Sequence, residues 1–291
     1  MTTLALDYAD RDGQRARRNW MLSRVAIYGA LCLFGVVYLV PALLVFANAF
    51  RSPAEVALNG MIALPQSFSF DNWVRVWTKA CVSGTCNGIA PNFYNSLRLV
   101  IPATIISTVL GALNGYVLSK WRFRGSELVF GMMLAGVFLP GQITLLPWAW
   151  IMGKLGLANN INGLILIHTV QGISFTTLFC RNFYVGLPDE IIKAARIDGA
   201  GFWRIFRRIV LPLSGPILAV TVIWQFTSIW NEYLFGMVFT AGDEQPITAA
   251  LMSVRAGGSS AAVLIGAIPP LLVYLIGGKY FVRGLTQGAL K

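Results

Sequence analysis

Four polar or aromatic residues lie close together near the end of a long apolar segment: Gln225, Trp230, Asn231 and Glu232. An ionisable side chain in a membrane-crossing segment is costly, so it usually faces a bundle interior or a water-filled path. Amide and carboxylate groups beside an aromatic face suit a neutral polyhydroxylated solute, which makes these residues candidates for lining a path. The alternative is a structural polar cluster near the outer interface that pairs with a partner helix.

Other chemistry finds little support among the residues. His168 is the single histidine and lies inside an apolar segment, so we interpret it as a hydrogen-bonded packing residue. No CxxC or Cys/His spacing typical of a metal site is present. The sequence also lacks a GxxxxGK[ST] loop that would hold nucleotide phosphates. We therefore expect no metal, no cofactor and no catalytic residue in this chain, and no ATP hydrolysis by it.

The most patterned polar stretch covers residues 187–216, which read LPDEIIKAARIDGAGFWRIFRRIVLPLSGP. Asp189 and Glu190 place negative charge in the first turn of a short helix, and Gly199 supplies the left-handed turn that ends it. A second helical pattern follows, with apolar residues on one face and arginines on another; these are Phe202, Ile205, Phe206 and Ile209 against Arg204, Arg207 and Arg208. Charge and amphipathicity alone would favour a basic loop lying on the membrane surface.

The spacing within this stretch resembles the EAA signature of ATP-binding-cassette (ABC) importer permeases. The matching positions are Lys193, Ala194, Ala195, Gly199, Ile209, Leu211 and Pro212. The resemblance implies that residues 187–208 form a coupling loop whose helix docks into a cleft of a cytoplasmic ATPase, with Glu190, Asp198 and Arg204 among the coupling residues. Lys193 replaces the family's glutamate, so the contact of that glutamate is not carried over, although neighbouring Glu190 could partly substitute for it.

The composition is that of a membrane protein. Hydrophobic residues make up 56% of the chain and charged residues 12%, and the mean hydropathy is +0.65, well outside the soluble norm. A net charge of +11 would suggest a nucleic-acid partner in a soluble chain. Here the charges alternate with apolar segments, so they set orientation first, and no nucleic acid is expected.

Hydropathy predicts an all-α, polytopic fold with six transmembrane helices, because each crossing needs about 20 apolar residues. The expected spans are about 24–49, 93–119, 126–152, 162–184, 209–239 and 260–281. Together they form a permease domain over residues 24–283, with a tail at 1–23, outer loops at 51–92 and 240–259, and a tail at 284–291. Pro140 and Pro147 interrupt the third span, which is tolerated where a helix faces protein or water.

The distribution of basic residues predicts the orientation. Of the 23 Lys and Arg residues, 17 fall on the side that holds both termini and the 187–208 loop, which the positive-inside rule makes cytoplasmic. Cys81 and Cys86 then lie on the outer side, where disulfides persist. Four intervening residues with a glycine permit the geometry of a bridge. A disulfide and two reduced thiols both remain open.

The resemblance extends over residues 28–291 and is closest to carbohydrate-uptake permeases of the glucose/mannose type. It rests on FYNS at 93–96, KAARIDGAGF, the paired cysteines, the sequence of residues 230–232 and the ending GKYFVRGLTQGALK. It implies the type I importer fold in the bacterial cytoplasmic (inner) membrane. It also implies a heterodimer with a second permease, two ATPase subunits that hold ATP and Mg, and an extracytoplasmic sugar-binding protein that docks on the outer loops. Thr286, Gln287 and Gly288 would reach the ATPase interface.

The substrate implied by this resemblance is a monosaccharide such as glucose or mannose, with an oligosaccharide or a polyol as the alternative. An ion-coupled secondary transporter would need its own ion site and usually internal repeats. A membrane-embedded enzyme would need an ionisable cluster beyond His168 and Glu232. Neither alternative explains the spacing of residues 193–212.

Overall fold

The computed structural model describes residues 2–63, 65–254 and 259–289, with side chains described for 20–52, 54–63, 65–254 and 260–278. Throughout these ranges the regular structure is helical, apart from a single antiparallel bridge between Val82 and Thr85. An all-α fold is therefore confirmed for the part of the chain that is described.

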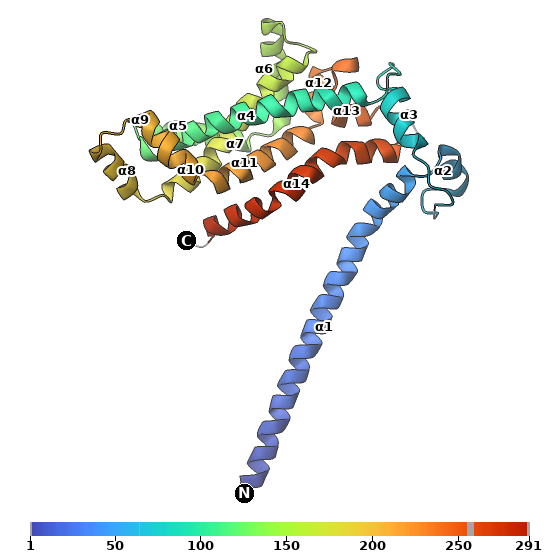
Figure 1. Cartoon of the computed structure of the whole chain (residues 1–291), viewed down its shortest axis with the longest axis vertical. Coiled ribbons are helices and arrows are strands. Elements are labelled where there is room, and N and C mark those ends of the chain that lie inside the picture. Colours follow the sequence, from blue (N-terminus) through green and yellow to red (C-terminus); the bar gives the residue numbers. More distant parts are fainter. Residues whose placement is uncertain (1, 64, 255–258, 290–291) are drawn as a thin grey trace.

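The helices follow one another in a simple order (Figure 1). The long ones are α1 (Thr2–Ala49), α4 (Ala90–Lys120), α5 (Ser126–Phe138), α6 (Gly141–Leu155), α7 (Ile161–Val185), α11 (Gly215–Trp230) and α14 (Ser259–Ala289). The short ones are α2 (Pro53–Asn59), α3 (Asp71–Lys79), α8 (Asp189–Ile197), α9 (Phe202–Ile205), the π-helix η1 (Phe206–Val210), α10 (Leu211–Leu213), α12 (Leu234–Phe239), the 3₁₀-helix η2 (Gly242–Glu244) and α13 (Ile247–Leu251).

Helices α4, α7, α11 and α14 form the bundle that positions the other elements (Figure 1), and α4 packs most extensively against α7. Small residues allow this close approach. A Cβ added to Gly111 would lie 2.0 Å from the Thr176 hydroxyl, which itself donates to the Ser107 carbonyl at 2.7 Å across the interface. Such small-residue contacts are typical of packed membrane helices.

Two hydrophobic cores lie at opposite ends of the bundle, which we call the α3 end and the α8 end. The core at the α3 end joins the outer loops to the bundle and includes Val76, Leu99, Ile161, Trp230 and Ile247. The core at the α8 end joins α8, α9 and η1 to the ends of α4 and α7; it includes Tyr116, Cys180, Tyr184, Ile192, Phe206 and Val210. The segments outside the spans are therefore packed parts of the fold.

Helix α1 stands away from the bundle along most of its length (Figure 1). Its stretch Trp20–Ala49 has a mean hydropathy of 2.6, and none of its most apolar window is buried. Residues 2–23, which lie within the tail expected at 1–23, form the first part of this 48-residue helix. Extending an existing helix avoids the cost of a new nucleus, and residues 2–23 contain no proline that would interrupt it.

Among the described residues, four helices are long and apolar enough to cross a membrane, and two bent pairs bring the number to as many as six. The third expected span is broken between α5 and α6 by a bend of 104°, at the Pro140-Gly141 pair. The fifth expected span is bent by 76° between Phe202–Leu213 and Gly215–Trp230, with Ser214 at the bend. Pro212 and Pro216 flank this bend. Because proline has no backbone N–H, neither residue can donate the hydrogen bond that a straight helix would need at its position. This span also ends at Trp230 instead of 239.

The end of the described chain is helical, as its beginning is. Helix α14 continues to Ala289, so residues 284–289, expected as a separate tail, form the last turns of this helix. These turns lie at the α8 end of the bundle (Figure 1). The side chains of Thr286 and Gln287 lie outside the described part of the chain, and only the backbone of these residues and Gly288 is placed.

Candidate functional site

The segment α8–α10 forms a packed corner at the α8 end of the bundle. Helix α8 has Asp189 and Glu190 in its first turn, where carboxylates oppose the positive end of the helix dipole. Its Ile192 and Ala195 are buried, 5% and 8% exposed, in the core that also holds Tyr116. One face of this short helix is thus attached to the membrane bundle and the other is free.

The turn after α8 has the geometry expected of a glycine stop. Gly199 has a φ of +74°, its amide donates to the Arg196 carbonyl at 3.0 Å, and the Ala200 amide donates to the Ala195 carbonyl at 2.9 Å. This pair of hydrogen bonds is a Schellman motif, which requires the left-handed conformation at the glycine. Asp198 is the C-cap residue.

The helix after this turn has the two faces expected from its sequence. Phe202, Ile205, Phe206 and Ile209 all pack in the core at the α8 end, whereas Arg204, Arg207 and Arg208 are exposed. The helix widens to a π-helix at Phe206–Val210, and Pro212 follows in α10. Beyond the bend, the Ser214 hydroxyl donates to the Tyr184 hydroxyl at 3.1 Å, so the corner is also attached to α7.

A polar attachment that the sequence did not indicate holds α8 to the end of α4. The Lys120 ammonium donates to Asp189 Oδ1 and to the Leu187 carbonyl, each at 2.6 Å. The Arg196 guanidinium donates to the Lys120 carbonyl at 3.1 Å and lies 4.2 Å from the Trp121 ring centroid. The hydrogen bond and the charge of Lys120 lower the pKa of the Asp189 carboxyl. Lys120 and Asp189 are 69 positions apart, so no sequence pattern predicts their contact. The basic turn after α4 indicated only which side of the membrane it faces.

Of the remaining residues expected in the coupling segment, Glu190, Lys193 and Ala194 all lie on the exposed side of α8. The structure therefore brings together residues 187–213 as one unit. Glu190, Lys193, Ala194 and Arg204 lie on its exposed side, whereas Ala195 and Ile209, which the resemblance also singled out, face the core at the α8 end.

The four candidate path residues near the end of α11 separate into different environments. Gln225 and Trp230 are buried within the chain, 5% and 2% exposed, and the indole N–H of Trp230 donates to the Gly266 carbonyl at 2.8 Å. Glu232 accepts hydrogen bonds from the Phe235 and Gly236 amides at 2.9 and 3.2 Å, so it caps α12. Asn231 alone is exposed.

His168 lies beside this cap. Its side chain is 6% exposed, and its Nε2 lies 3.6 Å from Glu232 Oε2, while its ring makes an edge contact with Phe235 at 5.9 Å between centroids. The Nε2 atom of His168 has no hydrogen-bond partner in the described part of the chain, so the hydrogen bond expected from the sequence is not formed at this atom. His168 contacts α12 through its ring and lies beside the carboxylate that precedes this helix.

The exposed face of α11 carries a different set of residues. Trp224, Ser228 and Asn231 follow one another at helical spacing, and all three are exposed. The Trp224 ring is stacked on Phe175 of α7 with 5.1 Å between centroids. Asn231 is one of the four candidates from the sequence, whereas Trp224 and Ser228 are not among them, because hydropathy does not distinguish the faces of this largely apolar helix.

The two outer loops form a single cap at the α3 end. Cys81 and Cys86 are joined by a disulfide, which closes a small hairpin across the bridge between Val82 and Thr85. From this hairpin Ser83 donates to Gln245 Oε1 and Thr85 donates to Asp243 Oδ1, both at 2.9 Å. The loop at 51–92 thus contacts the loop at 240–259 directly.

A buried ion pair fixes the beginning of this cap. Arg51 is fully buried and donates from Nε to Glu55 Oε1 at 2.9 Å and from Nη1 to Asn48 Oδ1 and the Gly60 carbonyl, each at 2.9 Å. Glu55 also accepts from the Gln66 amide at 2.8 Å. This hydrogen bond, together with those from Arg51 and Ser67, lowers the pKa of Glu55 against the opposing effect of burial.

Comparisons with known proteins agree with this arrangement. Residues 90–287 match the family described as the inner membrane component of binding-protein-dependent transport systems. A probable ABC transporter permease from Pyrococcus horikoshii is 45% identical over 185 residues, covering 61% of this chain and 67% of the relative. The diacetylchitobiose uptake system permease NgcG of Streptomyces coelicolor is 31% identical over 273 residues, covering 91% and 88%.

A solved structure supports the same fold. A chain of a bacterial ABC transporter that imports the acidic polysaccharide alginate aligns with a TM-score of 0.73 at 22% identity, covering 88% of this chain and 95% of that one. The family match spans well over half of the chain and includes the whole bundle and the α8–α10 corner. The chain therefore belongs to the family of inner-membrane permease components of binding-protein-dependent ABC importers.

Proposed function

We propose that this chain is one of two related membrane subunits of an ATP-driven sugar importer, where it forms half of the path and transmits movements of the ATPases. The observation that carries the proposal is the α8–α10 corner. Its helix α8 follows the end of α7, it is attached to α4 and α7 through Lys120 and Tyr184, and its opposite face is exposed.

The free face of the corner suits a protein partner. Ile197 is 86% exposed and Trp203 is 59% exposed, beside Glu190 and Arg204. Apolar side chains rimmed by charge are typical of docking surfaces. Two ATPase subunits, which would hold ATP and Mg, would draw this face with them when they close. Because the corner is packed on α4 and α7, the spans would follow and switch between two states.

The long apolar helix α1 supports a second membrane subunit. None of the most apolar window of α1 is buried, whereas 33–50% of the corresponding window is buried in the other unbroken candidate spans. Within the described chain, the only extensive contact of α1 is with α14. A related permease that packs against α1 would give this helix the neighbours that it lacks here. The end of α14 lies at the same side as α8, which would place residues 284–289 within reach of the ATPases.

The exposed face of α11 is the place where we expect the solute to pass. An aromatic platform at Trp224, followed by the hydroxyl of Ser228 and the amide of Asn231, offers stacking and hydrogen bonds to a neutral sugar. The relative from Streptomyces coelicolor is named for diacetylchitobiose, which favours an oligosaccharide. A monosaccharide such as glucose or mannose remains the alternative within the same proposal, and the cap at the α3 end would receive the sugar-binding protein.

The proposal is tested by photo-crosslinking in membranes that contain the whole transporter. A photoreactive amino acid at position 197 should capture an ATPase subunit, and the same amino acid at position 58, whose leucine is 84% exposed on the outer loop, should not. Sugar uptake into vesicles should require internal ATP and persist when ion gradients are dissipated. Equal capture at both positions would contradict the coupling role, and gradient-driven uptake without ATP would favour a secondary transporter.

A further inference from the structure

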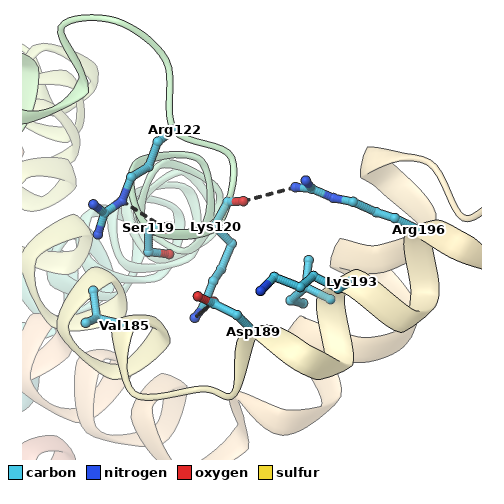
Figure 2. A pocket seen from close by; sticks show the side chains of 8 residues that line it. Ser119, Lys120, Arg122, Val185, Asp189, Lys193 and Arg196 are labelled. Carbon is cyan, nitrogen blue, oxygen red and sulfur yellow. Dashed lines mark hydrogen bonds and ion pairs between the residues drawn. The ribbon is translucent and has the colours of Figure 1, made fainter.

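A cavity of about 450 Å³ lies between α8 and the ends of α4 and α7. Its walls are Ser119, Lys120, Arg122, Val185, Asp189, Ile192, Lys193 and Arg196, and we call it the basic cavity (Figure 2). Its volume falls within the range of about 300–1,000 Å³ that is usual for small-molecule sites. The cavity is therefore large enough for a headgroup or a small anion.

The basic cavity has an excess of positive charge. Four cationic side chains line it, against the single carboxylate of Asp189. The Lys120 side chain is only 5% exposed and is paired with this carboxylate, so Asp189 is already engaged. Like charges gathered at one cavity repel one another, and an anion between them would remove that repulsion.

Lys193 is the cation whose ammonium donors are available to a ligand. It forms no hydrogen bond or ion pair with any residue in the described part of the chain, although its side chain points toward Asp189 (Figure 2). Arg122 and Arg196, in contrast, donate to the carbonyls of Ser119 and Lys120 at 3.3 and 3.1 Å. These backbone contacts hold two guanidinium groups at the rim. Arg122 also lies 3.9 Å from Glu127 Oε1 in an exposed ion pair, which water screens, so its remaining N–H donors can turn toward an anion in the cavity.

The cavity lies where two candidate membrane spans end. Lys120 and Val185 are the last residues of two candidate membrane spans, and both line the cavity. The turn that follows α4 exposes Trp121 and Phe123 between basic residues, a composition typical of the membrane interface. Basic pockets at this position between helices are suited to anionic headgroups.

We propose that the basic cavity binds the phosphate group of an anionic phospholipid, with Lys193 and Arg122 as its principal cationic contacts. Free phosphate shares this chemistry but lacks the acyl chains that would hold it at the end of the spans. A bound headgroup would connect the turn after α4 with α8, and would therefore strengthen the attachment that Lys120 and Asp189 already make.

Native mass spectrometry of the intact transporter, purified through a tag on this chain, tests the proposal. The complex is equilibrated with phosphatidylglycerol, with zwitterionic phosphatidylcholine or with inorganic phosphate, and retained adducts are measured. Lys193→Gln combined with Arg122→Gln should lower phosphatidylglycerol retention by about tenfold or more, because each cation near the surface contributes substantially to anionic-lipid binding. The matched control is Arg24→Gln with Arg124→Gln, which removes the same charge from two exposed residues on the same side that do not line the basic cavity.

Each outcome decides the matter. Selective loss of phosphatidylglycerol in the cavity variant, with the control unchanged and millimolar phosphate unable to compete, supports the lipid site. Equal loss in both variants would reduce the effect to general surface charge and overturn the proposal. Competition by inorganic phosphate would assign the cavity to a soluble anion. Unchanged lipid retention with loss of the ATPase subunits would assign the cations to a protein contact instead.

Discussion

The ammonium group of Lys120 lies 2.6 Å from Asp189 Oδ1, so the last residue of a membrane-crossing helix holds the first residue of the short helix outside it. Lys120 is 5% exposed at its side chain and Asp189 is 64% exposed. The contact is therefore protected on one side and open to water on the other. It ties the movement of α8 to the movement of α4.

Replacing Lys120 with Met should uncouple the two helices. The apolar stem is kept while the hydrogen bonds to Asp189 and Leu187 are lost, so α8 should move more freely against α4. We expect membrane insertion to be normal and sugar-stimulated ATP hydrolysis to fall severalfold in reconstituted transporter. Lys79→Met, at the α3 end, is the matched control. Stimulated hydrolysis equal to wild type in Lys120→Met would show that this contact does not transmit coupling.

The same contact predicts how the attachment of α8 to α4 depends on pH. Lys120 lowers the pKa of Asp189 in the folded chain. The ionised pair therefore stabilises the folded state at every pH above about 3.9, the ordinary pKa of an aspartate. That contribution is lost only as the pH falls through the lowered pKa. Exchange of the α8 amides with deuterium should therefore show no step caused by Asp189 between neutral pH and pH 5. A step in this interval that disappears in Asp189→Asn would contradict the lowered pKa.

The glycine after α8 should tolerate substitution poorly. Gly199 has a φ of +74° and open space around its α-carbon, so a substitution meets backbone strain without a steric clash. Gly199→Val should destabilise the turn by about 1–2 kcal/mol and lower stimulated ATP hydrolysis. Gly199→Asn should do so less, because asparagine accepts the left-handed region. Gly201→Val is the control, since Gly201 has a φ of −78° and equally open space; equal effects at both positions would exclude strain as the cause.

The close crossing of α4 and α7 should be sensitive to a single methyl group. Gly111→Ala would place its Cβ 2.0 Å from the Thr176 hydroxyl, and overpacking of this kind costs about 1–3 kcal/mol. Gly131→Ala, with nothing within 4 Å, should leave stability unchanged. Thermal unfolding in detergent, followed by intrinsic tryptophan fluorescence, measures both. A midpoint for Gly111→Ala equal to that of Gly131→Ala would mean that the helices separate readily at this point.

The features that could be predicted from sequence are those that depend on neighbouring residues. The stop at Gly199, the two faces of residues 202–209 and the positions of the apolar segments all follow from local pattern. The contact of Lys120 with Asp189 could not, because it depends on α4 and α7 first packing through Gly111 and Thr176. The buried positions of Gln225 and Trp230 were missed for the same reason: hydropathy does not distinguish the faces of an apolar helix, whereas packing does. The length of α1 exceeded the apolar stretch because helix propagation continues into polar sequence.

Opening the disulfide in the outer cap should weaken the docking of the binding protein. The bridge between Cys81 and Cys86 closes a short loop. By lowering the conformational entropy of the open loop, such a bridge stabilises the folded hairpin by about 2 kcal/mol. That hairpin carries Ser83 and Thr85, which contact the second outer loop. In Cys81→Ser with Cys86→Ser we expect the binding-protein concentration for half-maximal uptake to rise severalfold while the maximal rate is kept. Cys32→Ser, which removes an exposed free thiol in α1, should leave both unchanged. A half-maximal concentration equal to wild type in the double variant would show that the hairpin is not part of the docking surface.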